Sequence, residues 1–277
     1  MNDNVEGWER RKVDFSRIHG DDSEAYHSLL NNLGLREGML VVDLMGGYGA
    51  VSQKVLEYCE SKGIWANLML LDAYSTQLDM SREILAPYEA KGHSVVRILE
   101  DARNYPFSEG EIDKVIVKMG LHEVGRDEQQ GILERAIASL KQNGDLFVWE
   151  SVGKTPKIRD YFRKIVRKKD ELAGYRSLAE NRYFCYEEEL IGLLEGAGGQ
   201  RIARIYDGDF NLATGAFCEA DFGGDVEKLR EWNEYIRSVV PLDVAETIRL
   251  HDSNDSLEMR FDKKIFQVGK GGEKNGQ

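Results

Sequence analysis

The stretch VVDLMGGYGAVS, residues 41–52, decides the fold of this chain. Apolar β-forming residues lead through Asp43 into a loop that contains Gly46, Gly47 and Gly49, and a helical pattern begins directly after the loop. α/β proteins hold nucleotide-like ligands with this order of strand, glycine loop and helix, because glycine allows positive φ and a close approach of the ligand. For the loop taken alone, a tight turn that only packs the strand on the helix is the alternative interpretation.

Strand-like and helix-like patterns alternate from residue 39 onward. Short apolar runs typical of buried strands occur at residues 39–44, 68–71, 95–99, 115–117 and 146–149. This alternation predicts an α/β protein with a doubly wound, mainly parallel sheet of seven strands, a Rossmann-like arrangement. The last two strands are expected at residues 201–206 and 257–268, with the final one antiparallel to the sixth and at the sheet edge.

The pattern also suggests how the chain is organised around this sheet. A helical insertion is expected within the core at about residues 155–180, where the strand and helix rhythm changes. We expect five segments in order, which are an N-terminal helical lid segment (1–35), the ligand-binding core (36–207), a cap inserted before the last strand (208–256), the last core strand (257–268) and a disordered tail (269–277).

Composition excludes several classes of function. The formal net charge is −12, and such an acidic surface repels a phosphate backbone, so the sequence argues against a nucleic-acid-binding protein. The chain has no apolar run long enough for a membrane span and no signal-peptide pattern at its N-terminus, so we expect a cytoplasmic protein. Cys59, Cys185 and Cys218 are widely separated, so we expect neither a disulfide framework nor a metal site, and no thiol-based arsenite methylation.

Residues 154–169 contain eight basic side chains and one acidic side chain, Asp160. Apolar residues recur there at helical spacing, which predicts an amphipathic helix with its bases on the opposite face. A solvated face or a partner surface is the expected role, and an anion-steering patch is the alternative. This helix and the 208–256 insertion are both candidate surfaces for a homodimer.

Acidic residues at the ends of the first strands indicate which ligand the glycine loop holds. Asp72 ends the second strand, where a carboxylate can accept hydrogen bonds from a ribose, and Asp101 ends the third, where an adenine edge would lie. Asp43 suits a cationic ligand end and disfavours a pyrophosphate, and Ser52 stands where a dinucleotide fingerprint has its third glycine. These features favour S-adenosylmethionine. An NAD(P)-linked oxidoreductase and a non-methylating S-adenosylmethionine-binding protein are the alternatives.

Taken together, these segments resemble the class I S-adenosylmethionine-dependent methyltransferases, in the small-molecule branch related to the ubiquinone/menaquinone methyltransferases. The resemblance covers about residues 25–207 and the last strand. The matching segments are VVDLMGGYG (41–49), LLDAYSTQLDMSRE (70–83), EDARNYPFSEGEID (100–113), VIVKMGLHEV (115–124), RAIASLKQNGDLFVWE (135–150) and RYFCYEEELIGLLEGAGG (182–199).

The resemblance implies a cofactor site built from the strand ends. It implies that the methionine part of the cofactor is bordered by Asp43, Gly46, Gly47 and Gly49. It implies that Asp72 binds the ribose. The adenine is then contacted by Ala73, Tyr74, Asp101 and Ala102. The floor beneath the sulfur is formed by Lys118 and Met119. Met45 departs from the pattern, because the family usually has its first glycine there, and we expect the loop to turn differently or to pack more tightly.

The acceptor side of the site is less defined by the sequence. His122, directly after the cofactor floor, is the candidate general base, with Glu123 as a second candidate, and a histidine that only hydrogen-bonds a helix start is the alternative. Much of the catalysis can come from holding acceptor and methyl group in line. The sequence leaves open whether oxygen, nitrogen, sulfur or carbon of the small-molecule acceptor is methylated.

Two further groups of residues are predicted near the acceptor. Tyr183, Phe184 and Tyr186 are expected to form an aromatic wall, with core packing as the alternative. Arg182 could bind a carboxylate or phosphate, or could form a surface ion pair. Trp232 and Tyr235 from the insertion are expected to close over the site. A lid on the cofactor's carboxylate is expected from the N-terminal residues Phe15, Arg17, His19 and Tyr26.

Overall fold

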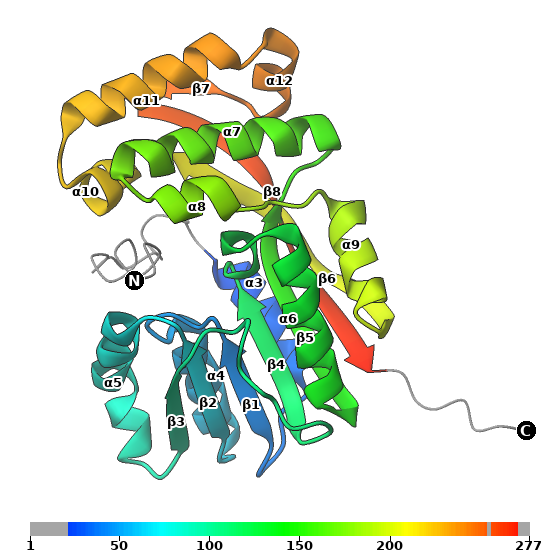
Figure 1. Cartoon of the computed structure of the whole chain (residues 1–277). Coiled ribbons are helices and arrows are strands. Elements are labelled where there is room, and N and C mark those ends of the chain that lie inside the picture. The colour runs from blue at the N-terminus through cyan, green and yellow to red at the C-terminus, as the bar shows by residue number, and fades with distance from the viewer. Residues whose placement is uncertain (1–21, 254–255, 271–277) are drawn as a thin grey trace, which may run out of the picture.

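A computed structural model describes residues 22–253 and 256–270 of the chain (Figure 1). Within these residues one sheet of eight strands forms, in the order β3-β2-β1-β4-β5-β8-β6, with the short β7 paired to β8. Its strands are β1 (Leu40–Leu44), β2 (Asn67–Asp72), β3 (Ser94–Leu99), β4 (Ile112–Lys118), β5 (Leu140–Val152), β6 (Gly199–Ala213), β7 (His251–Ser253) and β8 (Ser256–Lys270).

The sheet is parallel from β3 to β5 and antiparallel beyond. The predicted doubly wound α/β fold is therefore confirmed, but the predicted position of the last strand is wrong. β8 lies between β5 and β6, and β6 is the edge. Burial gives the physical reason, since Ile265 and Phe266 of β8 are buried on opposite faces, whereas most residues of β6 are partly or fully exposed.

Helices cover both faces of the sheet (Figure 1). Successive strand residues such as Val41 and Val42 point to opposite faces, so each face receives its own hydrophobic core. One core includes side chains of α3 (Ser23–Leu33), α4 (Ala50–Lys62) and α5 (Ser75–Glu89). The other includes side chains of α6 (Arg126–Ser139) and α9 (Glu187–Gly196).

A helical lobe lies beyond the carboxyl ends of the parallel strands (Figure 1). It packs on the outer parts of β6 and β8 through a third core, which includes Phe210, Leu212, Met259 and Phe261. Trp232 is fully buried there, and its indole nitrogen donates to the carbonyl of Ile165 at 2.9 Å. The lobe consists of α7 (Pro156–Ala173), α8 (Arg176–Asn181), α10 (Ala216–Phe222), α11 (Val226–Val239) and α12 (Leu242–Thr247).

Two predicted segment boundaries need correction. The cap expected from residue 208 begins later, because β6 continues to Ala213 and stays paired with β8 as far as Glu258. Residues 269 and 270, which were expected in the tail, belong to β8, and the ammonium of Lys270 donates to the carbonyls of Ala138 and Leu140. Residues 271–277 lie outside the described part of the chain.

The basic helix α7 does not leave all of its bases in solvent. The side chain of Lys169 is 4% exposed and lies beside Asp170 and Asp221, and the side chain of Arg159 is 13% exposed and pairs with Glu189. The apolar stripe of α7 continues through position 169, so helical geometry turns that lysine inward. The exposed-face interpretation is therefore wrong for these two residues.

Cys59, Cys185 and Cys218 are free thiols, and the first two are buried. Among residues 22–253 and 256–270, we find no helix with the length and apolar character that a membrane crossing requires.

We predict that Trp232→Phe lowers the free energy of unfolding by roughly 2 kcal/mol, because the change leaves a cavity and removes the hydrogen bond from the indole to the carbonyl of Ile165. Urea unfolding followed by circular dichroism measures the change. Leu242→Ala is the control in the same lobe, since Leu242 is 76% exposed and surface changes alter stability by less than about 0.5 kcal/mol. Equal stability of the two variants would contradict the stabilising role of Trp232.

Candidate active site

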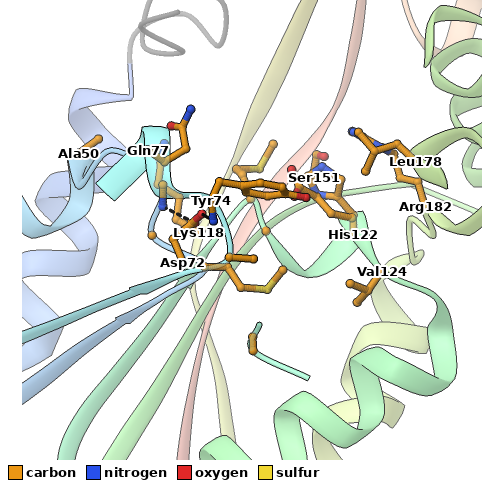
Figure 2. A pocket seen from close by; sticks show the side chains of 18 of the residues that line it. Ala50, Asp72, Tyr74, Gln77, Lys118, His122, Val124, Ser151, Leu178 and Arg182 are labelled. Atoms are coloured by element: carbon orange, nitrogen blue, oxygen red, sulfur yellow. Dashed lines mark hydrogen bonds between the residues drawn. The ribbon is translucent and has the colours of Figure 1, made fainter. Parts of the chain in front are cut away.

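One cavity runs along the carboxyl ends of β1, β2 and β4 and continues into the helical lobe (Figure 2). In parallel α/β sheets this edge is where ligands bind. Its cofactor half is lined by predicted site residues, which are Asp43, Gly46, Gly47, Asp72, Ala73, Tyr74, Asp101, Ala102, Lys118 and Met119. Gly49, the remaining predicted residue, forms the end of the loop and the start of α4.

The glycine loop is held tightly against β2. The amide of Gly47 donates to Asp72 Oδ2 at 2.8 Å, and the amide of Gly49 donates to the carbonyl of Gly46 at 3.0 Å. A Cβ added at Gly46 would lie 2.3 Å from a methyl carbon of Leu70, so no side chain fits at that position. Gly47 and Gly49 have φ values of 56° and 85°, which glycine adopts without strain.

The structure shows how the loop accommodates Met45, the residue that departs from the family pattern. Its φ is 59°, so it adopts the left-handed conformation that a glycine would adopt with less strain. A Cβ added at Gly120 would lie 2.8 Å from the Cβ of Met45, so the absence of a side chain at Gly120 makes room for the methionine. The loop therefore turns with a methionine in place at a cost of about 1–3 kcal/mol, and its packing against Gly120 is tight.

Asp43 is a buried carboxylate that lies next to the loop. Its Oδ2 accepts from the hydroxyl of Ser52 at 2.6 Å and from the amide of Ser52 at 3.0 Å, whereas Oδ1 has no hydrogen-bond partner among the described residues. Burial raises the pKa of Asp43 to about 7, although the hydrogen bonds from Ser52 lower it. Ser52 thus positions Asp43, and one carboxylate oxygen remains for a donor on a ligand.

Asp72 connects the ends of β1 and β2. Besides the amide of Gly47, it accepts a hydrogen bond from the amide of Tyr74 at 2.9 Å. Burial raises its pKa to about 6, against the opposing effect of these backbone hydrogen bonds. Each carboxylate oxygen has a second lone pair, so Asp72 can also accept from two neighbouring hydroxyl groups.

Asp101 is paired with Arg103, a residue that was not among the predicted site residues. The guanidinium of Arg103 donates to both oxygens of Asp101, at 2.6 Å from Nη2 and 3.0 Å from Nε, and also to Glu128 at 2.7 Å. Burial raises the pKa of Asp101, but the hydrogen bonds from Arg103 outweigh it and hold the pKa below its usual range. Asp101 lines the cavity as an ionised, fixed acceptor.

Lys118 and Met119 form the floor of the cavity at the end of β4. The ammonium of Lys118 lies 3.2 Å from Asp22 and 4.7 Å from the centroid of the Trp149 ring. Burial lowers the pKa of Lys118, while Asp22 raises it. Met119 has a φ of 55°, and its amide donates to the carbonyl of Trp149 at 2.8 Å, so β5 fixes this strained floor residue.

These groups suit S-adenosylmethionine better than a dinucleotide. Two buried carboxylates beside the loop would repel a pyrophosphate, whereas an ammonium can donate to the open oxygen of Asp43 and a ribose can donate to Asp72. Asp101 offers acceptor oxygens to an adenine amino group.

The acceptor half of the cavity is lined mainly by phenylalanines from four elements. Phe162 of α7 has its ring centroid 4.1 Å from that of Phe184, and Phe210 of β6 and Phe217 of α10 complete the wall. Flat, apolar walls of this kind favour a flat, apolar ligand.

His122 lies between the two halves of the cavity, in the short helix η1 (Leu121–Glu123), as Figure 2 shows. Its Nδ1 lies 2.6 Å from Glu150 Oε2, and the other oxygen of Glu150 accepts from the amide of Leu121 at 2.8 Å. The ring stacks on Phe184 with a centroid distance of 4.5 Å. A carboxylate only accepts hydrogen bonds, so the contact with Glu150 favours a proton on Nδ1 and leaves Nε2 as the nitrogen that can accept a proton.

Several predicted acceptor residues lie elsewhere. Phe184 and Arg182 line the cavity, but Tyr183 and Tyr186 do not: the Tyr183 hydroxyl donates to Glu189 at 2.5 Å, and Arg159 lies over both tyrosine rings. Their expected place in the aromatic wall is wrong, because both rings pack against Arg159, outside the cavity lining.

The residues expected to close over the site are also placed differently. Trp232 is part of the lobe core, and Tyr235 lies beside Lys168, so neither is among the residues that line the cavity. Tyr26 packs edge-on against Trp149, with its centroid 5.0 Å away, beneath the floor. Phe15, Arg17 and His19 lie outside the described residues.

Glu150 and Lys169 are functional groups of this region that the sequence did not single out. Glu150 is an acidic residue near the end of a buried strand, the same signal that indicated Asp72 and Asp101. Lys169 continues the apolar stripe of Phe162 and Val166 on α7, so helical spacing alone indicated a buried lysine.

Comparison with known proteins defines the class. A family model described as a methyltransferase domain matches residues 41–144. The chain carries a class I S-adenosylmethionine-dependent methyltransferase domain, and S-adenosylmethionine is its cofactor.

Individual relatives agree with this class. The ubiquinone/menaquinone biosynthesis C-methyltransferase UbiE of Klebsiella pneumoniae is 29% identical over 180 residues, which cover 61% of this chain and 69% of that protein. The corresponding protein of Azotobacter vinelandii is 28% identical over 183 residues, with the same two coverages.

Solved structures share the fold. A putative methyltransferase of Bacillus halodurans superposes with a TM-score of 0.72 at 16% identity, covering 90% of this chain and all of that one. Phosphoethanolamine N-methyltransferase 2 of Haemonchus contortus, solved with phosphomonomethylethanolamine and S-adenosylhomocysteine, has a TM-score of 0.57 at 14% identity, covering 93% of this chain and 56% of that one.

We predict that Asp72→Ala weakens the binding of S-adenosylhomocysteine at pH 8 by about 10- to 100-fold, because hydrogen bonds to an ionised group are lost. Isothermal titration calorimetry measures the dissociation constant. Asp79→Ala on α5 is the matched control, since the Asp79 side chain is 71% exposed. Unchanged affinity of Asp72→Ala would refute the ribose contact.

The affinity of the unaltered protein should also depend on pH. Burial raises the pKa of Asp72 in the free protein to about 6, and the expected contact with the ribose hydroxyls needs its ionised form. The dissociation constant should therefore rise by at least about tenfold from pH 7 to pH 5 as Asp72 takes up a proton, and further because Asp43, whose pKa is about 7, takes up a proton over the same range. A pH-independent dissociation constant over this range would contradict the assignment.

Proposed function

We propose that the protein transfers the methyl group of S-adenosylmethionine to a small molecule that bears a hydroxyl group and binds among the phenylalanines of the acceptor half. The observation that carries this proposal is the buried contact of 2.6 Å between His122 Nδ1 and Glu150 Oε2. A histidine held in this way, on the wall of a cavity that continues into the cofactor half, is arranged to take a proton from an acceptor.

Burial and packing fix the base in one orientation. His122 is 7% exposed and Glu150 is 3% exposed, and the stack on Phe184 restricts rotation of the imidazole ring. Glu150 also stabilises the imidazolium that forms when Nε2 takes the proton. The amide of Leu121 holds the second oxygen of Glu150, so the carboxylate keeps its position during proton transfer.

The cofactor, when bound, supplies a methyl carbon that is activated by its sulfonium. The chain's own contribution is to orient the acceptor in line with that carbon and to remove the hydroxyl proton. The helical lobe contributes Phe162 and Phe217 to the acceptor half, which supports a role as a cap that shields this step from water.

Carbon methylation of the same kind of acceptor is a second candidate function, favoured because the UbiE relatives are named as C-methyltransferases. Removal of a proton from a ring hydroxyl also raises the electron density at neighbouring ring carbons, so His122 would serve both reactions. Transfer of a ¹³C-methyl group, followed by NMR of the product, distinguishes an ether carbon from a ring methyl carbon.

We predict that His122→Asn lowers kcat/KM by about 10²- to 10⁴-fold, the range of a lost general base, while the affinity for S-adenosylhomocysteine stays unchanged. Glu150→Gln should lower kcat/KM as well, because the amide favours the wrong imidazole tautomer. Release of S-adenosylhomocysteine is measured against a panel of small hydroxylated aromatic compounds.

His251→Asn is the matched control, since His251 is a 57% exposed histidine that lies beside Glu258 on the surface. It should retain full activity. Full activity of His122→Asn with an acceptor that the unaltered protein methylates would rule out His122 as the base.

A further inference from the structure

A buried cluster of four charged side chains lies at the end of the acceptor half. The ammonium of Lys169 is 2.9 Å from Asp170 Oδ1 and also contacts Asp221, and Arg182 Nε is 3.2 Å from Asp170 Oδ2. The side chains of Lys169, Asp170, Arg182 and Asp221 are 4%, 0%, 10% and 0% exposed. Desolvation of charged groups is costly even when they are paired, so a buried charged cluster beside a cavity points to a functional role.

The two cations of this cluster face the cavity. Lys169 and Arg182 are among the residues that line it, whereas the two carboxylates are not. In Figure 2, Arg182 and Leu178 lie on the far side of His122 and Ser151 from Asp72 and Gln77 of the cofactor half. An acceptor with one end at His122 therefore has its other end toward Arg182.

Arg182 has an unused donor at this position. Its Nη2 is buried and makes no hydrogen bond to any part of the chain that the structure describes. An unpaired buried donor costs about 1–3 kcal/mol, and more for a charged group. Nε also lacks a hydrogen-bond partner among the described residues, and its ion pair with Asp170 Oδ2 at 3.2 Å places the guanidinium at the cavity, with Nη2 left for a ligand oxygen.

We propose that the acceptor bears a carboxylate, which accepts hydrogen bonds from the guanidinium of Arg182, because the ammonium of Lys169 is already paired with Asp170 and Asp221. This inference rests on the proposed function, since it assigns a substrate class to the same cavity. A planar guanidinium matches the two oxygens of a carboxylate, and the phenylalanine walls between the two polar ends match a flat apolar body. The acceptor is therefore a hydroxylated aromatic acid.

The test compares acids with their uncharged esters. Protein saturated with S-adenosylhomocysteine is titrated with 4-hydroxybenzoate, 4-hydroxyphenylacetate and 4-hydroxycinnamate, and with the methyl ester of each, by isothermal titration calorimetry. At least one acid should bind about tenfold more tightly than its ester, the effect of one hydrogen bond to a charged group. Equal or tighter binding of the esters, or no binding of any acid, overturns the proposal.

Variants locate the preference at Arg182. Arg182→Gln should abolish the preference for the acid, and Arg182→Lys, which keeps the charge but loses the planar donors, should retain part of it. Arg176→Gln is the matched control, because Arg176 is an exposed arginine on the same helix α8. An acid preference that survives in Arg182→Gln overturns the assignment.

Measurements on the same protein preparations distinguish a failure of this proposal from a failure of the proposed function. Binding of S-adenosylhomocysteine is measured first and should be equal in all three variants and the unaltered protein, which also shows that the variants are folded. If the unaltered protein shows no preference for the acids but transfers methyl groups to uncharged acceptors, the carboxylate is refuted and the proposed function stands. Full activity of His122→Asn would refute the base while leaving the acid preference in place.

Discussion

The pairing of β8 with both β5 and β6 is the interaction on which the rest of the structure depends. Its inner part, from Asp262 to Gly269, completes the core sheet against β5, and its outer part pairs with β6 and carries the helical lobe. The phenylalanine wall and the charged cluster belong to the lobe, whereas the carboxylates and the glycine loop belong to the core. One continuous strand pairing thus fixes the acceptor half relative to the cofactor half.

The cofactor half concentrates negative charge in a dry environment. Asp43 and Asp72 are both nearly inaccessible to solvent, and burial raises the pKa of each. Ser52 donates hydrogen bonds to Asp43, and the amide of Gly47 donates to Asp72. Such a site is unfavourable when empty and favourable for a ligand with a positive charge and hydroxyl donors. The burial of these two carboxylates therefore determines which ligand binds as much as their positions do.

Local patterns predicted most of the core and the cofactor half. The strand alternation and the acids at strand ends depend on residues close in sequence, so the positions of Asp43, Asp72 and Lys118 at one edge could be predicted. The acceptor half could not, because Phe162, Phe210 and Phe217 come together only through long-range packing of the lobe. Tyr183 and Tyr186 lie in the same segment as Phe184, but their side chains do not line the cavity.

The long strand β8 also has a consequence for how the molecule folds. Asp145 of β5 pairs with Gly269 of β8, so this contact joins residues far apart along the chain, whereas β1, β2 and α4 associate through short connections. Contacts between distant residues form late, since the entropy of closing a long loop opposes them. The glycine loop can therefore organise early, and the wall that selects the acceptor becomes complete only in the last stage of folding.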